Sequence, residues 1–221
     1  MAILRNPTTL PEVLELYSNK PVPVPGSSPI RYKSQNPNKV ANAIPQAVAD
    51  NALQTAIAVR DLDVAMGIVE ASYTTKAFHR AKFMRVAALP TTGLALSPFA
   101  AYVLASSFAG WQTTMDPSVA TSIAFTGMMA YVTFTSTLGL VAITTANDHM
   151  DRITWQQGVP LTERWIREEE RAAIDKMADA WGFRESWRRG EEEGRDWEDL
   201  REWVGLRSML LDSVDSMADM R

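Results

Sequence analysis

The sequence predicts an all-α protein in which two transmembrane helices form a hairpin between helical N- and C-terminal extramembrane regions. Two observations indicate this fold. The 30 residues of 86–115 and the 31 residues of 117–147 contain no charged side chain, and Asp116 alone separates them. A helix on the surface of a soluble protein needs a polar face, usually with charges in it, and neither run has one.

Composition narrows the function classes. The chain has 221 residues, no cysteine and two histidines, and its net charge is −4. The absence of cysteine excludes disulfides, thiolate-held zinc and thiol catalysis. The acidic balance makes nucleic acid an improbable partner, because nucleic-acid binders carry a basic face. We therefore expect no metal or other cofactor.

Charge also divides the chain into regions. Residues 1–85 have a net charge of +4, residues 86–147 of −1 and residues 148–221 of −7. From these shifts we expect four parts. They are an extended N-terminal segment with a short helix (1–43), a helical hairpin with a basic juxtamembrane segment (44–85), the two transmembrane helices (86–147) and an acidic, Trp-rich helical tail (148–221).

The first part has no apolar run typical of a secretory signal. A short helix is predicted over Leu10–Tyr17, with Pro11 in its first turn. The alternating prolines of Pro21–Gly26 favour an extended, polyproline-type strap, and residues 27–40 are predicted to be irregular.

Two helices are predicted over 44–59 and 62–74, with Arg60 and Asp61 in the turn. Residues 52–69 resemble one unit of a tetratricopeptide- or pentatricopeptide-like helical hairpin. A solenoid needs about three units, and no second copy is visible, so we carry over no repeat function.

The segment before the first span is basic. Its cations are expected to contact anionic lipid headgroups, and ordinary positive-inside flanking explains them better than contact with RNA. These candidate headgroup ligands are Lys76, Arg80, Lys82 and Arg85.

The two transmembrane helices are predicted at about 87–111 and 118–146. The alternative is a buried helical hairpin in a soluble protein, which a chain of this length can hardly shield. Basic residues flank the hairpin on both outer sides and are missing from its loop, so both tails are expected on one side of the membrane. The spans contain no Asp, Glu, Lys, Arg or His, which disfavours a channel or transporter.

Small residues recur at every fourth position of both spans. Such ridges let two helix backbones approach closely inside lipid. The predicted helix-packing residues are Gly93, Ser97, Ala101, Ala105 and Ala109 in the first span and Ser122, Thr126 and Ala130 in the second.

The tail is predicted to contain a helix from Thr162 to Trp181 and a last helix that begins near Asp196 and continues to about Ala218. The glutamate runs 168–170 and 191–193 are expected on solvated faces. The apolar face of the last helix is either the core of a small helical unit or a surface that docks protein partners, as Trp-rich faces do. Its candidate docking residues are Trp197, Leu200, Trp203 and Val204.

These features favour a non-catalytic membrane anchor, accessory subunit or assembly factor of an organellar protein complex. The weakly apolar spans suit the mitochondrial inner membrane with both tails in the matrix, and the alternative is the endoplasmic reticulum with cytosolic tails. The alternative functions are an enzyme that uses the juxtamembrane cluster Asp148, His149 and Asp151, and a channel or transporter component.

Overall fold

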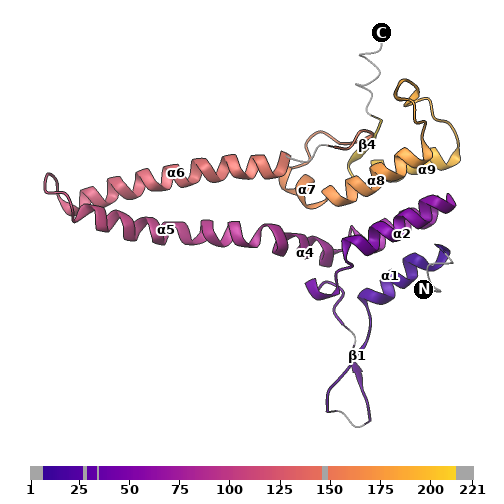
Figure 1. Cartoon of the computed structure of the whole chain (residues 1–221), viewed down its shortest axis with the longest axis horizontal. Coiled ribbons are helices and arrows are strands. Elements are labelled where there is room, and N and C mark those ends of the chain that lie inside the picture. Colours follow the sequence, from indigo (N-terminus) through magenta and orange to yellow (C-terminus); the bar gives the residue numbers. More distant parts are fainter. Residues whose placement is uncertain (1–6, 27–28, 34, 146–148, 213–221) are drawn as a thin grey trace. The chain divides into compact units, whose positions relative to one another are not determined.

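The computed structural model describes residues 7–26, 29–33, 35–145 and 149–212 (Figure 1). The chain is mostly helical, with a few short strands, and divides into two compact units. One, here called the two-segment unit, combines the chain up to Lys82 with the chain from Asp148 onward, and the other, the apolar unit, is Phe83–Asn147. The regions that flank the apolar stretch in the sequence therefore belong to one unit.

The described part of the N-terminal segment starts at a 3-10 turn, η2 (Pro7–Thr9), which is followed by α1 (Leu10–Ser18), and α1 agrees with the predicted helix. Beyond α1 the predicted extended strap is one arm of a β-hairpin. Strand β1 (Val22–Pro23) pairs antiparallel with β2 (Tyr32–Lys33). A second 3-10 turn, η3 (Val40–Asn42), precedes the next helix.

Helices α2 (Gln46–Val59) and α3 (Leu62–Ser72) form the predicted helical pair. Arg60 ends α2 in the left-handed conformation, with φ of 61°, and the Asp61 side chain accepts a hydrogen bond of 3.1 Å from Val64 N to cap α3. Such caps satisfy backbone groups that the helix ends leave free. Helix α4 (Lys76–Val86) follows and continues from the two-segment unit into the apolar unit.

The C-terminal segment differs from the prediction in three places. The helix expected over 162–181 is divided at Arg167 into α7 (Leu161–Ile166) and α8 (Glu168–Trp181). The last helix, α9 (Arg195–Gly205), ends well before residue 218. Two strands absent from an all-α fold, β3 (Ile153–Trp155) and β4 (Met209–Leu211), pair antiparallel. A further 3-10 turn, η4, covers Ser186–Arg188.

One hydrophobic core joins both segments of the two-segment unit. The N-terminal segment contributes apolar faces of α1, α2 and α3, and the C-terminal segment contributes α8, α9, β3 and β4. Ile68, Ile174 and Leu200, for example, are each fully buried. The two segments therefore contribute to a single core, which is larger than the share that either one supplies.

The apolar unit consists of α5 (Ala88–Ala109) and α6 (Pro117–Thr145), which run side by side in Figure 1. The predicted spans match both helices closely. In the connecting loop, the Asp116 carboxylate accepts a hydrogen bond of 2.8 Å from Ser118 N, which caps α6. Gln112 Oε1 accepts from the backbone of Thr114 and Met115, so the loop is held by its own polar side chains.

Candidate functional site: the apolar helices and a charged clasp

Helices α5 and α6 are long and apolar enough to cross a membrane, by length and composition. Their 22 and 29 residues extend for about 33 and 44 Å at 1.5 Å per residue, against a hydrocarbon core of about 30 Å. Only 11% of the most apolar stretch of α5, and 0% of that of α6, is buried within the protein. Core helices of soluble proteins are mostly buried, so this exposure argues against the soluble alternative.

The small-residue ridge of α5 lies partly within the hairpin. Ala101, Ala105 and Ala109 are buried, Ser97 is half-buried and Gly93 is exposed. Helices α5 and α6 contact each other extensively, and the methyl groups of the three alanines allow a close approach.

The ridge of α6 lies elsewhere. Ser122, Thr126 and Ala130 are exposed, while Ala120 is buried and Met128 is half-buried. The side of α6 that faces α5 is therefore displaced from the ridge that the sequence suggests. The hydroxyls of Ser122 and Thr126 donate to carbonyls one turn earlier in the helix. These bonds satisfy polar groups that would be costly in lipid.

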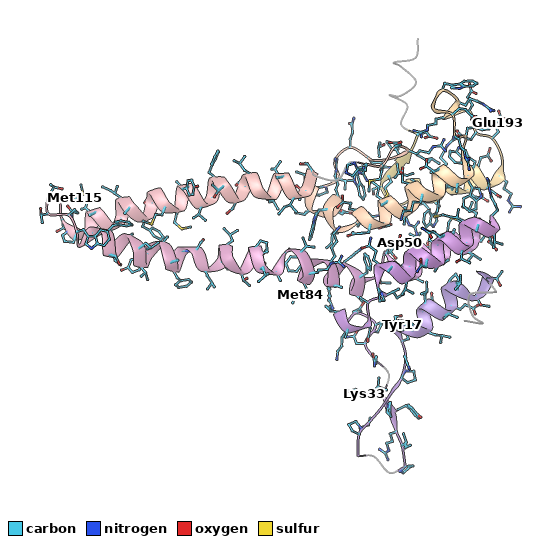
Figure 2. All side chains as sticks on the ribbon, viewed as in Figure 1. Tyr17, Lys33, Asp50, Met84, Met115 and Glu193 are labelled. Atoms are coloured by element: carbon cyan, nitrogen blue, oxygen red, sulfur yellow. The ribbon has the colours of Figure 1, made fainter. Side chains whose placement is uncertain are left out.

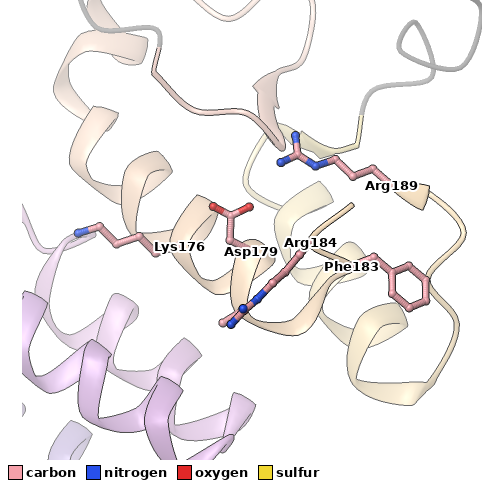
Figure 3. A pocket seen from close by; sticks show the side chains of 6 residues that line it. Lys176, Asp179, Phe183, Arg184 and Arg189 are labelled. Atoms are coloured by element: carbon pink, nitrogen blue, oxygen red, sulfur yellow. The ribbon is translucent and has the colours of Figure 1, made fainter. Parts of the chain in front are cut away.

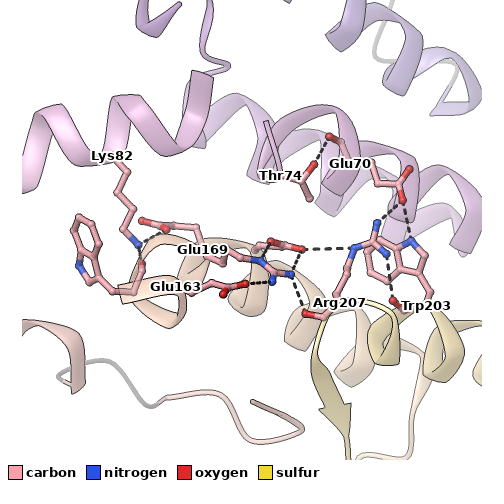
Figure 4. Close-up of polar contacts among 10 residues, drawn as sticks. Glu70, Thr74, Lys82, Glu163, Glu169, Trp203 and Arg207 are labelled. Atoms are coloured by element: carbon pink, nitrogen blue, oxygen red, sulfur yellow. Dashed lines mark hydrogen bonds and ion pairs between the residues drawn. The ribbon is translucent and has the colours of Figure 1, made fainter. Parts of the chain in front are cut away.

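Among the described residues, three cations form ion pairs that join the two halves of the two-segment unit, and we call these pairs the charged clasp. Lys82 of α4 contacts Glu169 of α8, Arg207 beyond α9 contacts Glu70 of α3, and Lys176 of α8 contacts Asp50 of α2. Figure 4 shows the first two. Lys82 also lies 3.6 Å from the carboxylate of Glu168. Each pair links residues on opposite sides of the apolar stretch in the sequence.

Lys82 is the most enclosed cation of the clasp, with 4% of its side chain exposed. Its ammonium group contacts the Glu169 carboxylate and donates to the carbonyl oxygen of Trp165. It also lies 5.0 Å from the centre of the Trp165 ring, which is a cation–π contact. Lys82 is therefore unavailable to lipid headgroups in this structure. The other candidate headgroup ligands, Lys76, Arg80 and Arg85, are exposed.

The second pair of the clasp includes a tryptophan. Trp203 Nε1 donates to Glu70 Oε1 at 3.1 Å, and the same carboxylate contacts Arg207. The guanidinium of Arg207 lies 3.7 Å from the centre of the Trp203 ring. Trp203, a candidate docking residue, thus helps to hold α9 against α3.

Beside the clasp, Glu170 is buried rather than solvated. Arg167 forms a bidentate pair with it, through Nε at 2.9 Å and Nη2 at 3.2 Å. The hydrogen bond to Glu170 raises the pKa of Arg167. His79 lies near this pair, and burial lowers its pKa. Its Nε2 atom is buried and has no hydrogen-bond partner within the part of the chain that the structure describes.

A second buried cation, Arg152, organises the C-terminal segment. Its guanidinium donates to Asp212 through two nitrogens, each at 3.1 Å, to the Ala178 carbonyl at 2.8 Å, and to Glu192. Glu192 therefore also departs from the solvated face predicted for its run. Burial disfavours an ionised Glu192, but hydrogen bonds from Arg152 and backbone donors lower its pKa overall. Burial raises the pKa of Asp212.

A polar pocket lies at the end of α8 (Figure 3). Its volume is about 440 Å³, and the side chains around it are mostly charged. Burial and the nearby Asp175 raise the pKa of Asp179. Two of its cations are engaged, since Lys176 contacts Asp50 and Arg189 lies 3.8 Å from Asp151. The lining residues are Lys176, Asp179, Ala180, Phe183, Arg184 and Arg189.

Most candidate docking residues lie in the core. Trp197, Leu200 and Val204 are buried, and Trp203 is partly buried against the core. Their face is covered by the protein itself because α9 packs on α8 and β4. A docking role for these side chains would require α9 to leave that core.

Two members of the alternative catalytic cluster lie within the described residues. Asp148 lies outside the described residues, and His149 and Asp151 are exposed. Within the described ranges, no group of three or more His, Asp or Glu side chains is arranged to hold a metal ion.

Sequence reasoning missed the clasp and the Arg152 cluster. The one available signal was the opposite sign of the charge in the N- and C-terminal regions, which favours their association without identifying the pairs.

No family model, curated protein or solved structure matches the chain.

Proposed function

We propose that the protein is a two-span integral membrane protein in which α5 and α6 insert as a hairpin and the two-segment unit lies on one side of the membrane. In this proposal it is a non-catalytic anchor, accessory subunit or assembly factor of a membrane complex. The apolar unit holds the protein in the bilayer, and the two-segment unit offers partners a folded surface.

One observation carries the proposal. The segments before and after the apolar helices share a hydrophobic core and the charged clasp. The shared core requires that both segments lie on the same side of a membrane. A chain that crosses the bilayer twice meets this requirement, because it returns to the side from which it started. A single span would separate the two segments. The basic flanks of the hairpin support the same arrangement, with both tails on the positive-inside side.

The character of the unit supports a binding role over catalysis. Its charged groups form ion pairs with one another, as in the clasp and around Arg152. The apolar helices also contain no Asp, Glu, Lys, Arg or His, and ion or proton pathways usually need one of these at membrane depth.

Cysteine accessibility tests the topology, because the natural chain has no cysteine and each introduced thiol is unique. Exposed positions for single substitutions are Val48→Cys in α2, Thr113→Cys in the loop and Leu206→Cys after α9. In sealed vesicles, an impermeant maleimide should label Val48→Cys and Leu206→Cys alike and Thr113→Cys oppositely. Opposite labelling of the first two variants, or extraction of the protein by alkaline carbonate, would contradict the proposal.

Affinity purification in mild detergent tests the accessory role. We expect other membrane subunits to co-purify in fixed proportion. A tagged protein that migrates only as a monomer would argue against the accessory role.

For the compartment, we propose the mitochondrial inner membrane with both tails in the matrix. The alternative is the endoplasmic reticulum membrane with cytosolic tails. Immunogold labelling of cells that express the tagged chain distinguishes them.

A further inference from the structure

The loop between α5 and α6 presents a large aromatic side chain to its surroundings. Trp111 is 79% exposed. Its ring meets that of Phe108 edge to face, with 5.2 Å between the ring centres. The indole N–H has no hydrogen-bond partner in the part of the chain that the structure describes. A ring that is apolar over most of its surface and keeps one N–H to donate suits the membrane–water interface, where tryptophan is enriched.

Many polar groups of this loop are satisfied within the loop itself. Gln112 Nε2 donates to Met115 O at 2.8 Å, and Gln112 Oε1 accepts from Thr114 N at 3.0 Å. Trp111 N donates to Phe108 O at 3.1 Å. Such internal bonds lower the cost of placing backbone where little water reaches it. The loop can therefore lie among lipid headgroups without leaving these groups unpaired.

A charged side chain limits how deep the loop can lie. Asp116 carries the single charge between residues 86 and 147. The hydroxyl and the backbone N–H of Ser118 both donate to its carboxylate, and these hydrogen bonds lower the pKa of Asp116. An ionised carboxylate is costly inside hydrocarbon. Asp116 therefore keeps the loop at or above the headgroup level, while Trp111 favours contact with the interface.

A second charge limits the other end of the apolar unit. Arg85 belongs to this unit and is exposed. Figure 2 labels its neighbour Met84 and, at the far end of the unit, Met115. Between these ends lies α5, whose 22 residues extend for about 33 Å at 1.5 Å per residue. The hydrocarbon core is about 30 Å thick, so Arg85 and Asp116 leave the hairpin little freedom to slide along the bilayer normal.

We propose that the loop between α5 and α6 lies at the lipid–water interface, with the Trp111 ring in contact with phospholipid headgroups and the ends of the acyl chains. This inference rests on the proposed function, because it requires that the hairpin crosses a bilayer. It adds the register of the hairpin, in which the hydrocarbon covers α5 from Leu89 to Phe108. The separation of the two charges favours lipid over a protein partner for this loop, because it matches the thickness of a bilayer.

The greater length of α6 makes the register testable. Its 29 residues extend for about 44 Å, which exceeds the hydrocarbon core by about 14 Å. With the loop at one interface, Gly127 lies about 15 Å from Pro117 along the helix, near the bilayer centre, and Thr137 lies about 30 Å along it, near the opposite interface. If Thr145 were at that interface instead, the loop would project into water and Thr137 would lie near the bilayer centre.

Spin labels on the full-length chain in phosphatidylcholine vesicles distinguish the two registers. The chain has no cysteine, so Thr113→Cys, Gly127→Cys and Thr137→Cys each give one label, and all three positions are exposed. A Cβ atom at Gly127 meets no atom within 4 Å. Oxygen, which concentrates in hydrocarbon, and a water-soluble nickel chelate both relax the label, and the ratio of their effects measures depth. We expect the highest ratio at 127, and lower ratios at 113 and 137 that still exceed that of the free label in buffer.

The three ratios separate this inference from the proposed function. A higher ratio at 137 than at 127 overturns the position of the loop and leaves the two-span proposal standing. The same holds if the label at 127 has a high ratio while the label at 113 behaves like the free label in buffer. Ratios equal to that of the free label at all three positions overturn the two-span proposal itself.

Substitution of Trp111 tests the side chain that holds the loop at the interface. With the label at Thr113→Cys, Trp111→Ala should lower the oxygen-to-nickel ratio toward that of the free label, and Trp111→Tyr, which keeps an amphipathic ring, should preserve it. Trp187→Ala is the matched control, because Trp187 is 66% exposed but belongs to the two-segment unit. If Trp111→Ala and Trp187→Ala give the same ratio, Trp111 does not hold the loop at the interface, and the proposal is wrong.

Discussion

Lys176 Nζ lies 2.8 Å from Asp50 Oδ1, although 126 residues separate them in the sequence. The same carboxylate oxygen accepts a hydrogen bond of 3.0 Å from the Tyr73 hydroxyl. The entire apolar hairpin lies between Asp50 and Lys176 in the chain. Any membrane that the hairpin crosses must therefore leave both residues on one side for this contact to exist.

The clasp pairs should differ in strength. Lys82→Met leaves Glu169 without its cation at a site where little water reaches, and should lower the free energy of unfolding by about 3 kcal/mol. Lys176→Met breaks a pair whose lysine is half-exposed, and should cost less than about 1 kcal/mol. Urea unfolding in detergent, followed by tryptophan fluorescence, measures both. Equal losses would show that burial does not set the strength of the clasp.

Tyr73 should make the protein sensitive to alkali. Its hydroxyl is buried beside Asp50, and burial, followed by the Asp50 charge, raises its pKa. Because the pKa of Tyr73 is raised in the folded protein, the contribution of its neutral hydroxyl to the free energy of unfolding is complete below the unfolded-state pKa of about 10. That contribution decreases as the pH rises above this value. Between that pH and the folded-state pKa, the unfolding free energy should fall by about 1.4 kcal/mol per pH unit more than in Tyr73→Phe. Unfolding of both proteins at pH 9 to 11 tests this, and parallel pH profiles would contradict it.

Much of the helical fold could be predicted because its signals are local. The bounds predicted for α5 and α6 lie within two residues of the observed ones, and the Arg60–Asp61 turn separates α2 from α3 as expected. Strand β4 could not be predicted, because it is stabilised by pairing with β3 more than 50 residues earlier. Three-residue strands of this kind depend on a partner that no local pattern identifies.

The clasp and the role of α9 escaped prediction for a related reason. An amphipathic helix has the same sequence pattern whether its apolar face meets its own core or a partner. Trp197 therefore suggested docking, whereas the fold buries it. Likewise, both glutamate runs have the composition of a solvated face. Glu170 and Glu192 are nevertheless buried, because each forms an ion pair with an arginine, Arg167 and Arg152 respectively.

The alanine ridge of α5 predicts an asymmetric response to added bulk. Ala105 is fully buried between the helices, and Val103 is 62% exposed. Ala105→Leu should force α5 and α6 apart and cost about 1–3 kcal/mol, while Val103→Leu should be tolerated. Thermal unfolding in detergent compares the variants with the natural protein. Similar melting temperatures for both would show that the ridge is not a packing surface.

Gly182 should be intolerant of any side chain, for a reason that lies in Arg152. The backbone at Gly182 is extended, with φ of −86°. Any residue can adopt this conformation, so the backbone itself does not require glycine here. A Cβ atom there would instead overlap the Arg152 guanidinium. The end of an arginine can usually move aside, but this one is fully buried and bonded to Asp212, Glu192 and the Ala178 carbonyl.

Gly182→Ala should consequently act like removal of the cation. Displacing the guanidinium leaves two carboxylates without their partner in a buried site, and such losses cost about 3–5 kcal/mol. Gly205→Ala is the matched control, because no atom lies within 4 Å of the added Cβ and alanine favours a helix by up to about 1 kcal/mol over glycine. Urea unfolding should therefore show a large loss for Gly182→Ala and none for Gly205→Ala. If Gly182→Ala unfolds like the natural protein, Arg152 has room to relocate, and its ion pairs do not hold the C-terminal segment together.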